Sequence, residues 1–385
     1  MTEQPVLATA DTTTAPHVAM VVEQMWQPVP GGSGTYIAEL ASALRNEQVR
    51  VAGLAAHHRR GEPDPGAVGL GKLPVRQSVL PRTLLYEAWN RLPGPRAESV
   101  VPGAEVVHAT TWAIPRTRLP LAVTVHDVAF RRSPEHFTRR GARYFERSLA
   151  RTRAEADAVI TPSRATADDC VRAGIETSRI TVIPHGVRTR TVADGDVTAL
   201  RTSLALTRDY VLWTGTREPR KNLPALLRAF TLLAADHPDL DLDLVLVGPA
   251  GWGDDSAETS LVADLGERVH VVGRLDDADL AAAYAGARAF AFPSTWEGFG
   301  LPVLEAMAYG APVVTSRGTS MEEVCGDAAL LAEPQDPGEI AARLADAVGP
   351  AHDSLSQAGR ERAATFTWEA CAAAHAEVYA GLVRA

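Results

Sequence analysis

Short apolar runs recur along the whole chain, separated by turns or by stretches with helical spacing. The runs lack the polar–apolar alternation of half-exposed strands, so each predicts a strand that is buried on both faces. They are His17–Val22, Val49–Leu54, Val106–Ala109, Leu121–Val125, Ala158–Thr161, Ile180–Ile183, Tyr210–Trp213, Leu242–Val247, Val269–Val272, Ala289–Phe292, Pro312–Thr315 and Ala328–Leu331. Strands that alternate with helices predict an α/β fold with parallel, doubly wound sheets.

The pattern divides the chain into two Rossmann-like halves. The polar, aperiodic stretch from Arg188 predicts a linker, and apolar spacing after Thr367 predicts a final helix. Residues 59–103 are rich in Pro, Gly and Arg, and no order of elements is predicted there. The predicted divisions are a disordered tail (1–16), a first domain (17–187), a linker (188–197), a second domain (198–365) and a terminal helix (366–385).

Composition is that of an ordinary soluble globular protein, with 385 residues, 46% hydrophobic and 22% charged. The net charge of −9 argues against a general nucleic-acid partner. The three cysteines are far apart and show no zinc spacing, which favours a reducing, cytoplasmic compartment. Residues 1–16 lack the features of a signal peptide, and no apolar stretch approaches the length of about 18 residues that spans a bilayer.

The stretch from Phe292 to Ala308 carries the strongest chemical pattern. A buried strand ends before Pro293, a short glycine turn follows, and Pro302 suits the first turn of a helix that ends at Gly310. A strand–turn–helix unit points backbone N–H groups at an anion. The amides expected to be free for a phosphate are those of Phe299, Gly300 and Leu301.

Two carboxylates frame this turn. Glu297 lies in the turn, and Glu305 lies on the apolar face of the helix, four residues after Leu301. A buried carboxylate is costly unless it is paired or hydrogen-bonded. Two interpretations stay open: an internal salt bridge or cap, and a pair of acceptors for ligand hydroxyls.

A basic turn opens the second half. Arg217, Arg220 and Lys221 follow the strand 210–213 and precede a helix that begins near Leu223. Three cations at the carboxyl end of a strand, beside a helix N-terminus, favour a diphosphate site. A solvated basic turn is the alternative.

A histidine and an aspartate end one strand of the first half. His126 and Asp127 follow the strand 121–125, at the carboxyl edge of the predicted sheet, where a ligand cleft is expected in an α/β fold. The alternative for His126 is a structural role, hydrogen-bonded to a backbone carbonyl. Asp127 either orients His126 or caps the turn.

Glycines follow two further strands. Gly31 and Gly32 stand between the first strand and a helix, without the pattern of a Walker loop or of the dinucleotide fingerprint. Gly273 and Arg274 close the strand 269–272, and Arg274 is either a phosphate or base contact or simply exposed.

Other catalytic patterns are missing from the sequence. Asp239-Leu-Asp-Leu-Asp243 precedes a strand and is interpreted as a polar turn, at the end away from the cleft. No metal site is therefore expected, and no Gly-x-Ser-x-Gly, His-Glu-x-x-His or Cys-x-x-Cys motif supports a hydrolase or metalloprotease.

Arginines crowd the stretch Arg131–Arg153. Arg143, Arg147 and Arg151 fall on one helical face. A solvated face is one interpretation, and docking to an anionic membrane surface or a phosphorylated acceptor is the other.

The two glutamates, separated by seven residues that include Gly-Phe-Gly, resemble the hallmark of the retaining glycosyltransferases of family four, the GT-B "group one" enzymes. The resemblance implies that Glu297 contacts the donor sugar, Glu305 the nucleotide ribose and His126 the sugar near the reacting carbon. It also implies that Lys221 binds the diphosphate. Arg217 and Arg220 share the family's arginine role, because Thr216 follows Gly215 here.

The resemblance further implies the GT-B fold, with two Rossmann-like domains that face a central cleft and a last helix that crosses back to the first domain. Gly31 and Gly32 then line the donor–acceptor cleft, and the backbone at Gly273 borders the nucleobase. The expected activity is metal- and cofactor-independent, retaining transfer of a hexose, mannose-like as a first guess, from a nucleotide diphosphate sugar. The acceptor is a hydroxyl of a glycan, a lipid-linked molecule or a small molecule. A non-catalytic nucleotide-sugar or glycan-binding protein and a GT-B sugar phosphorylase are the alternatives.

Overall fold

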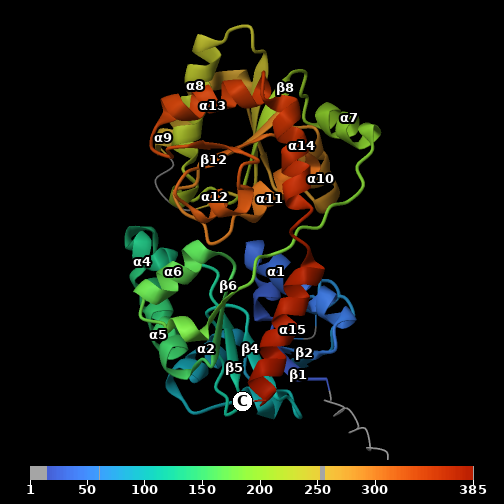
Figure 1. The fold of residues 1–385 in the computed structure, drawn as a ribbon, viewed down its shortest axis with the longest axis vertical. Coiled ribbons are helices and arrows are strands. Elements are labelled where there is room, and N and C mark those ends of the chain that lie inside the picture. The colour runs from blue at the N-terminus through green and yellow to red at the C-terminus, as the bar shows by residue number, and fades with distance from the viewer. Residues whose placement is uncertain (1–14, 60, 252–255, 385) are drawn as a thin grey trace, which may run out of the picture.

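The structure is a computed structural model that describes residues 15–59, 61–251 and 256–384. Two α/β units lie one above the other, joined by an extended segment and by the last helix (Figure 1). Residues 1–14, most of the predicted tail, lie outside the described residues.

The first unit is built on a parallel sheet in the order β3-β2-β1-β4-β5-β6-β7. Its strands are β1 (His17–Val21), β2 (Arg50–Ala55), β3 (Val75–Gln77), β4 (Val106–Ala109), β5 (Leu121–Thr124), β6 (Ala158–Thr161) and β7 (Ile180–Val182). The helices are α1 (Gly31–Ala43), α2 (Arg82–Arg91), α3 (Ala97–Val100), α4 (Ala129–Arg132), α5 (Arg139–Glu155) and α6 (Arg164–Arg172), with a 3-10 turn η1 (Glu23–Trp26) before α1.

The second unit is built on a parallel sheet in the order β10-β9-β8-β11-β12-β13. Its strands are β8 (Asp209–Thr214), β9 (Leu242–Val247), β10 (Val269–Gly273), β11 (Ala289–Phe292), β12 (Val313–Ser316) and β13 (Leu330–Ala332). The helices are α7 (Asp194–Ser203), α8 (Leu223–Asp236), α9 (Ser256–Leu265), α10 (Asp277–Ala285), α11 (Leu301–Tyr309), α12 (Ser320–Cys325), α13 (Pro337–Val348) and α14 (His352–Ala363). The last helix of the chain, α15 (Trp368–Arg384), returns to the first unit.

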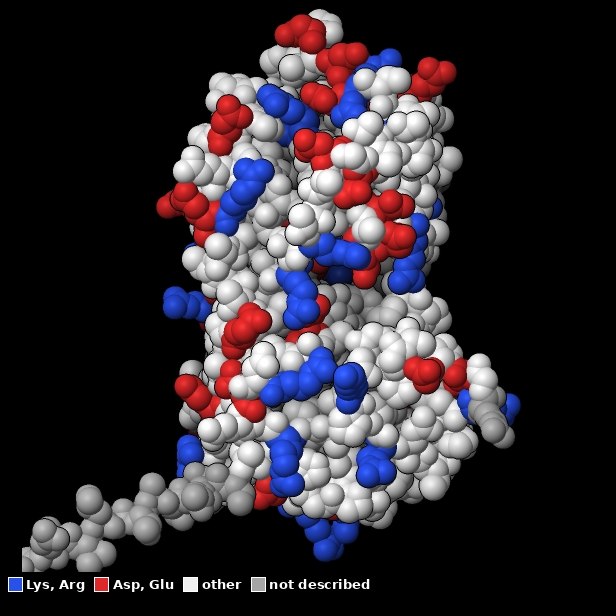
Figure 2. All heavy atoms as spheres, turned by 90° about the vertical axis from the view of Figure 1, so that its right-hand side faces the viewer, with Lys and Arg blue, Asp and Glu red and all other residues white. Residues whose placement is uncertain are grey.

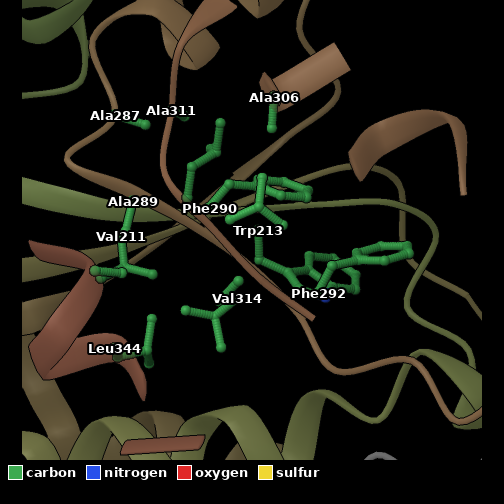
Figure 3. Close-up of a cluster of buried hydrophobic side chains, with 14 of the residues drawn as sticks. Val211, Trp213, Ala287, Ala289, Phe290, Phe292, Ala306, Ala311, Val314 and Leu344 are labelled. Atoms are coloured by element: carbon green, nitrogen blue, oxygen red, sulfur yellow. The ribbon is translucent and has the colours of Figure 1, made fainter. Parts of the chain in front are cut away.

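Buried aromatic side chains explain the continuous apolar strands of the second unit. Trp213, Phe290 and Phe292 are fully buried, and the rings of the two phenylalanines stack with centroids 5.8 Å apart (Figure 3). Helices cover both faces of this sheet, so neither face offers water to a polar side chain. The predicted doubly wound α/β class is confirmed.

Two details differ from the expectation. Strand β3 was not predicted, because it is a three-residue edge strand with a largely exposed pattern inside the irregular stretch 59–103. Helix α7 begins at Asp194, so the last residues of the predicted linker form its first turn, where Asp194 and Asp196 suit the positive end of the helix dipole.

The last helix lies along the first unit, beside α1 (Figure 1). Its attachment includes a buried polar network. The hydroxyl of Tyr36 on α1 is 2.8 Å from His375 Nε2 and 2.8 Å from Thr124 Oγ1, and the hydroxyl of Tyr379 is 2.8 Å from His108 Nδ1. Buried polar groups that satisfy one another in this way fix one arrangement of the packed elements.

Charged side chains of both signs are interspersed on the face shown in Figure 2, without a continuous basic surface. Within the described part of the chain, no helix combines the length and the apolar character that crossing a bilayer requires.

Candidate functional site

The carboxyl ends of the two sheets meet at Gly298. Its carbonyl oxygen accepts hydrogen bonds from Ser163 Oγ at 2.7 Å and from Thr166 Oγ1 at 3.0 Å, both at the start of α6. A Cβ on Gly298 would lie 1.7 Å from the carbonyl oxygen of His126, so only glycine fits there. The turn between β11 and α11 therefore contacts the segments that follow β5 and β6.

Charged groups extend this contact between the units. The Glu323 carboxylate on α12 accepts hydrogen bonds from the N–H groups of Arg164, at 2.9 and 3.0 Å, and of Ala165, at 3.3 Å. These are the first amides of α6, where a negative charge is favoured. Nearby, the Arg132 guanidinium lies 3.4 Å above the ring of Trp296.

Glu297 lies at the centre of a buried ionic cluster. Its carboxylate is 2.6 Å from Lys221 Nζ and 2.5 Å from the Arg220 guanidinium, and it accepts a hydrogen bond of 2.9 Å from Ser294 Oγ. Arg220 also pairs with Glu218 at 2.7 Å. The structure thus brings together Glu297, Lys221 and Arg220, and an internal salt bridge, one of the two open interpretations, is what Glu297 forms here.

Glu297 and Arg220 are charged at neutral pH. Burial by itself raises the pKa of Glu297, but the adjacent Arg220 and Lys221 outweigh it and lower the pKa to about 2. Burial lowers the pKa of Lys221 from its usual value, against the attraction of Glu297. The pKa of Arg220 is raised, because the surrounding carboxylates outweigh the effect of burial.

Glu305 has a different environment, although it lies on the helix that follows the same turn. It accepts a hydrogen bond of 2.9 Å from the hydroxyl of Tyr284, which is itself 2.8 Å from Thr214 Oγ1. No ion pair to Glu305 occurs among the described residues. Burial raises its pKa to about 7. It is therefore a half-buried carboxyl without a counter-ion, which suits a neutral hydroxyl as its ligand.

The turn that was predicted to bind an anion lies at the start of α11. Gly300 has φ +99°, and a Cβ there would lie 2.7 Å from Met321 Cγ. The N–H groups of Phe299, Gly300 and Leu301 donate to no acceptor in the described part of the chain. Leu301 Cδ1 lies 3.5 Å from the Cβ position of Gly32, so the first turns of α11 and α1 face each other across the two units.

Glycines line the cleft edge of the second sheet. Gly215 and Gly248 follow β8 and β9, and Gly273 is the last residue of β10; each has a positive φ. A Cβ on Gly248 would lie 1.9 Å from the carbonyl oxygen of Gly215, whereas one on Gly273 would meet no atom within 4 Å. This edge exposes backbone rather than side chains. A flat ligand group can approach it closely at Gly273.

Two predicted arginines lie apart from the Glu297 cluster. Arg217 forms an ion pair of 3.0 Å with Glu258 on α9. Arg274 is exposed and makes no ion pair with any described residue. Gly31, by contrast, begins α1 with φ +62° and has open space where its Cβ would be.

His126 hydrogen-bonds a backbone carbonyl. Its Nε2 is 3.0 Å from the carbonyl oxygen of Thr110, and burial lowers its pKa, so the ring is neutral at pH 7. That bond assigns the proton to Nε2 and leaves Nδ1 as an acceptor. Asp127 accepts a hydrogen bond of 2.9 Å from the amide of Ala129. Of the two roles that the sequence left open for Asp127, it therefore caps the turn.

One histidine at the site was not predicted. His185 follows β7, is 4% exposed, and neither ring nitrogen has a hydrogen bond in the described part of the chain. Its ring stacks on Trp368 and lies 5.6 Å from His126 and 5.0 Å from Phe299, centroid to centroid. No local pattern marks it, because its neighbours come from both units and from α15.

The arginine-rich stretch does not form one solvated face. Arg151 is buried: it pairs with Glu155 at 2.6 Å and donates to the carbonyl oxygens of Ile114 and Pro115. A helix packed against the loop after β4 must turn this position inward, which helical spacing alone does not reveal. Arg143 and Arg147 are exposed, and their Nε groups donate to the helix backbone.

The acidic turn before β9 is a structural ion-pair site. Asp243 lies within the strand, 1% exposed, 3.2 Å from Arg208 and 3.2 Å from His270. It stands at the amino-terminal part of β9, away from Gly298. The described ranges hold no group of three or more His, Cys, Asp or Glu side chains arranged for a metal ion.

Comparisons with known proteins agree on one family. The family model described as "Glycosyltransferase Family 4" matches residues 30–191, and the one described as "Glycosyl transferases group 1" matches residues 208–349. The chain is 33% identical to O-antigen chain mannosyltransferase B of Escherichia coli over 282 residues, 69% of this chain and 71% of that protein. It is 29% identical to an MMP alpha-(1->4)-mannosyltransferase of Mycolicibacterium hassiacum over 321 residues, 78% and 74% of the two chains. The structure of Anabaena Alr3699/HepE in complex with UDP and glucose superposes with a TM-score of 0.73 at 20% identity, covering 94% of this chain and 99% of that one.

Proposed function

The chain belongs to the group 1, family 4 glycosyltransferases, with the GT-B fold, and we propose that it transfers a hexose, with mannose as the first candidate, from a nucleotide diphosphate sugar with retention of anomeric configuration. The observation that carries the proposal is the buried Glu297–Lys221–Arg220 cluster beside the turn before α11, whose amides have no acceptor among the described residues. Glycosyl transfer from a nucleotide sugar is the activity of this family, and the two relatives named above are mannosyltransferases.

The cluster supplies what the departing nucleoside diphosphate needs. As the glycosidic bond breaks, negative charge grows on the leaving oxygen, and preorganised cations and amides stabilise it. Lys221 and Arg220 already lie next to each other, held by Glu297. We propose that donor phosphate oxygens take over contacts of these two cations, and that Glu297 then accepts hydrogen bonds from the sugar hydroxyls. No metal is required in this arrangement.

Retention results either from two successive inversions through a covalent intermediate or from direct attack on the face that the leaving group occupied. His126 is neutral and bonded to a carbonyl, and Glu297 is held by two cations, so neither is prepared to act as a covalent nucleophile. We propose that the acceptor hydroxyl attacks on the leaving-group side and passes its proton to the departing phosphate. Glu305 and Gly273 would then hold the ribose and the base.

A panel of nucleotide sugars tests the proposal. Slow hydrolysis of the donor, measured as release of the nucleoside diphosphate, should be detectable with one sugar in preference to the rest. Proton NMR of the sugar first released should show the anomeric configuration of the donor. Inversion would overturn the retaining mechanism. No turnover with any donor would favour a binding protein. Release of sugar phosphate from a glycan plus phosphate would favour a phosphorylase. A cytoplasmic location and contact of Arg131–Arg153 with an anionic membrane stay predictions.

A further inference from the structure

Unpaired polar groups and aromatic rings gather at the ends of β1 and β4, on the first unit beside His126. Glu23 follows β1 and is fully buried. Its Oε2 accepts hydrogen bonds from the amide of Ala56, at 2.8 Å, and from His58 Nε2, at 3.0 Å, whereas its Oε1 has no partner among the described residues. A buried carboxylate oxygen without a donor is costly, so it indicates a missing partner.

Two further polar groups near Glu23 lack partners in the described part of the chain. Tyr86 on α2 makes no hydrogen bond through its hydroxyl, and Trp112, in the loop after β4, makes none through its indole N–H. Burial raises the pKa of Tyr86, and the charges of Tyr144 and Glu23 raise it further. Because β1 and β4 are neighbours in the sheet, Glu23 and Trp112 follow adjacent strand ends.

Aromatic rings surround these groups. Tyr86 stacks on Tyr144, with centroids 6.4 Å apart, and on Trp89 at 5.8 Å, while Tyr144 donates to the carbonyl oxygen of Trp112 at 3.2 Å. On the other side, Trp26 stacks on His58 at 4.3 Å. Aromatic faces combined with a hydroxyl acceptor, an indole donor and a phenol match the alternating apolar and polar surface of a sugar ring.

The site lies next to the reacting groups. Trp112 is two residues after Thr110, whose carbonyl oxygen holds His126, and η1 leads directly into α1, whose Gly32 faces Leu301. A ligand bound here would present a hydroxyl toward the cleft. Among the described residues no Lys or Arg pairs with Glu23, so its carboxylate repels an anionic ligand.

We propose that Glu23, Tyr86 and Trp112 form the acceptor subsite and that the acceptor sugar bound there is uncharged. Glu23 accepts a hydrogen bond from a sugar hydroxyl, Trp112 donates one, and the ring packs on the aromatic cluster. This inference rests on the proposed function, since an acceptor exists only if the chain is a transferase.

The test compares transfer to methyl α-D-mannopyranoside with transfer to mannose 6-phosphate, using the donor that the wild type hydrolyses. The wild type should prefer the neutral glycoside. Tyr86→Phe should raise the KM for this glycoside about three- to tenfold, with donor hydrolysis and Tm unchanged, because only an unpaired hydroxyl is removed. Glu23→Gln should lower kcat/KM for the glycoside at least about tenfold and reduce the preference for the neutral acceptor.

Tyr210→Phe is the matched control. It also removes one tyrosine hydroxyl, but this hydroxyl donates to the carbonyl oxygen of Ala283 inside the second unit, so the variant should lower Tm and leave the KM for the glycoside unchanged. An unchanged acceptor KM in Tyr86→Phe, a phosphorylated acceptor used as well as the neutral one, or a wild type that hydrolyses donor but transfers to no neutral glycoside would each overturn the acceptor subsite alone. A wild type inactive with every nucleotide sugar would overturn the proposed function, and the subsite with it.

Discussion

Glu297 and Glu305 flank one glycine turn, yet they are held in opposite ways. Glu297 is locked between two cations, and its pKa is lowered to about 2. Among the described residues Glu305 is hydrogen-bonded by the hydroxyl of Tyr284 alone, and burial raises its pKa to about 7. The difference shows that the charge of a carboxylate in this cleft is decided by its partner rather than by its depth.

The contrast suits two different parts of one ligand. A permanently charged Glu297 both organises the cations that a diphosphate needs and remains available as an acceptor next to them. An unpaired Glu305 can exchange hydrogen bonds with a neutral diol without first breaking an ion pair. Four measurements would break or sharpen this comparison.

The largest effect is expected at the cation side of Glu297. Lys221→Ala should reduce turnover at saturating donor by at least about 10²-fold, because one oxyanion-type contact is worth a few kcal/mol in the transition state. Arg220 still pairs with Glu297 in this variant, so the fold should persist. Circular dichroism provides the control, and full turnover in a folded variant would remove Lys221 from the mechanism.

The two glutamates should fail differently when each is neutralised. Glu305→Gln should weaken binding of the bare nucleoside diphosphate by about 1.5–3 kcal/mol, the typical loss for a charged hydrogen bond. Glu297→Gln should leave that affinity intact and depress transfer, because its proposed contact is to the sugar. Calorimetry and turnover on both variants decide the point. Equal losses of affinity would mean that the pair is a structural unit that holds the turn.

Stability should depend on pH in opposite directions at the two residues. The folded pKa of Glu305 is raised, so between about pH 4.5 and 7 the native state holds a proton that the unfolded state has lost, and stability falls as pH rises. The folded pKa of Glu297 is lowered, so its contribution is lost as pH falls from about 4.5 toward 2. The stabilities of the wild type and Glu305→Gln, obtained from melting curves between pH 4.5 and 8, should therefore become equal toward low pH. At pH 8 the wild type should be less stable by roughly 1–3 kcal/mol. Parallel curves would contradict the raised pKa.

The smallest expected effect is that of a chelator. We propose that Lys221 and Arg220 take the role that a metal has in other transferases, so turnover should be the same with and without EDTA. Loss of activity that manganese restores would show that the cation pair does not suffice.

Much of the framework was predictable because it is local. Every strand except β3 was predicted to within two residues at each end, since burial of both faces requires a continuous apolar run. The cap at Ser163, whose side chain accepts from the amide of Thr166, and the glycine turn before α11 also follow from neighbouring residues. Arg151 and His185 were beyond such reasoning, because their partners lie in other elements.

The sequence by itself determined the two parallel sheets, the turns at their carboxyl ends and the residue types that line the cleft. The tertiary structure alone decided which charges pair: Lys221 and Glu297 are 76 residues apart, and only the adjacency of β8 and β11 brings them within 2.6 Å. It also decided that Glu305 pairs with no cation in the described ranges and that Arg151 turns inward. Hydrophobic burial is a property of each segment, whereas ion pairing and desolvation depend on distances between segments, which no local pattern contains.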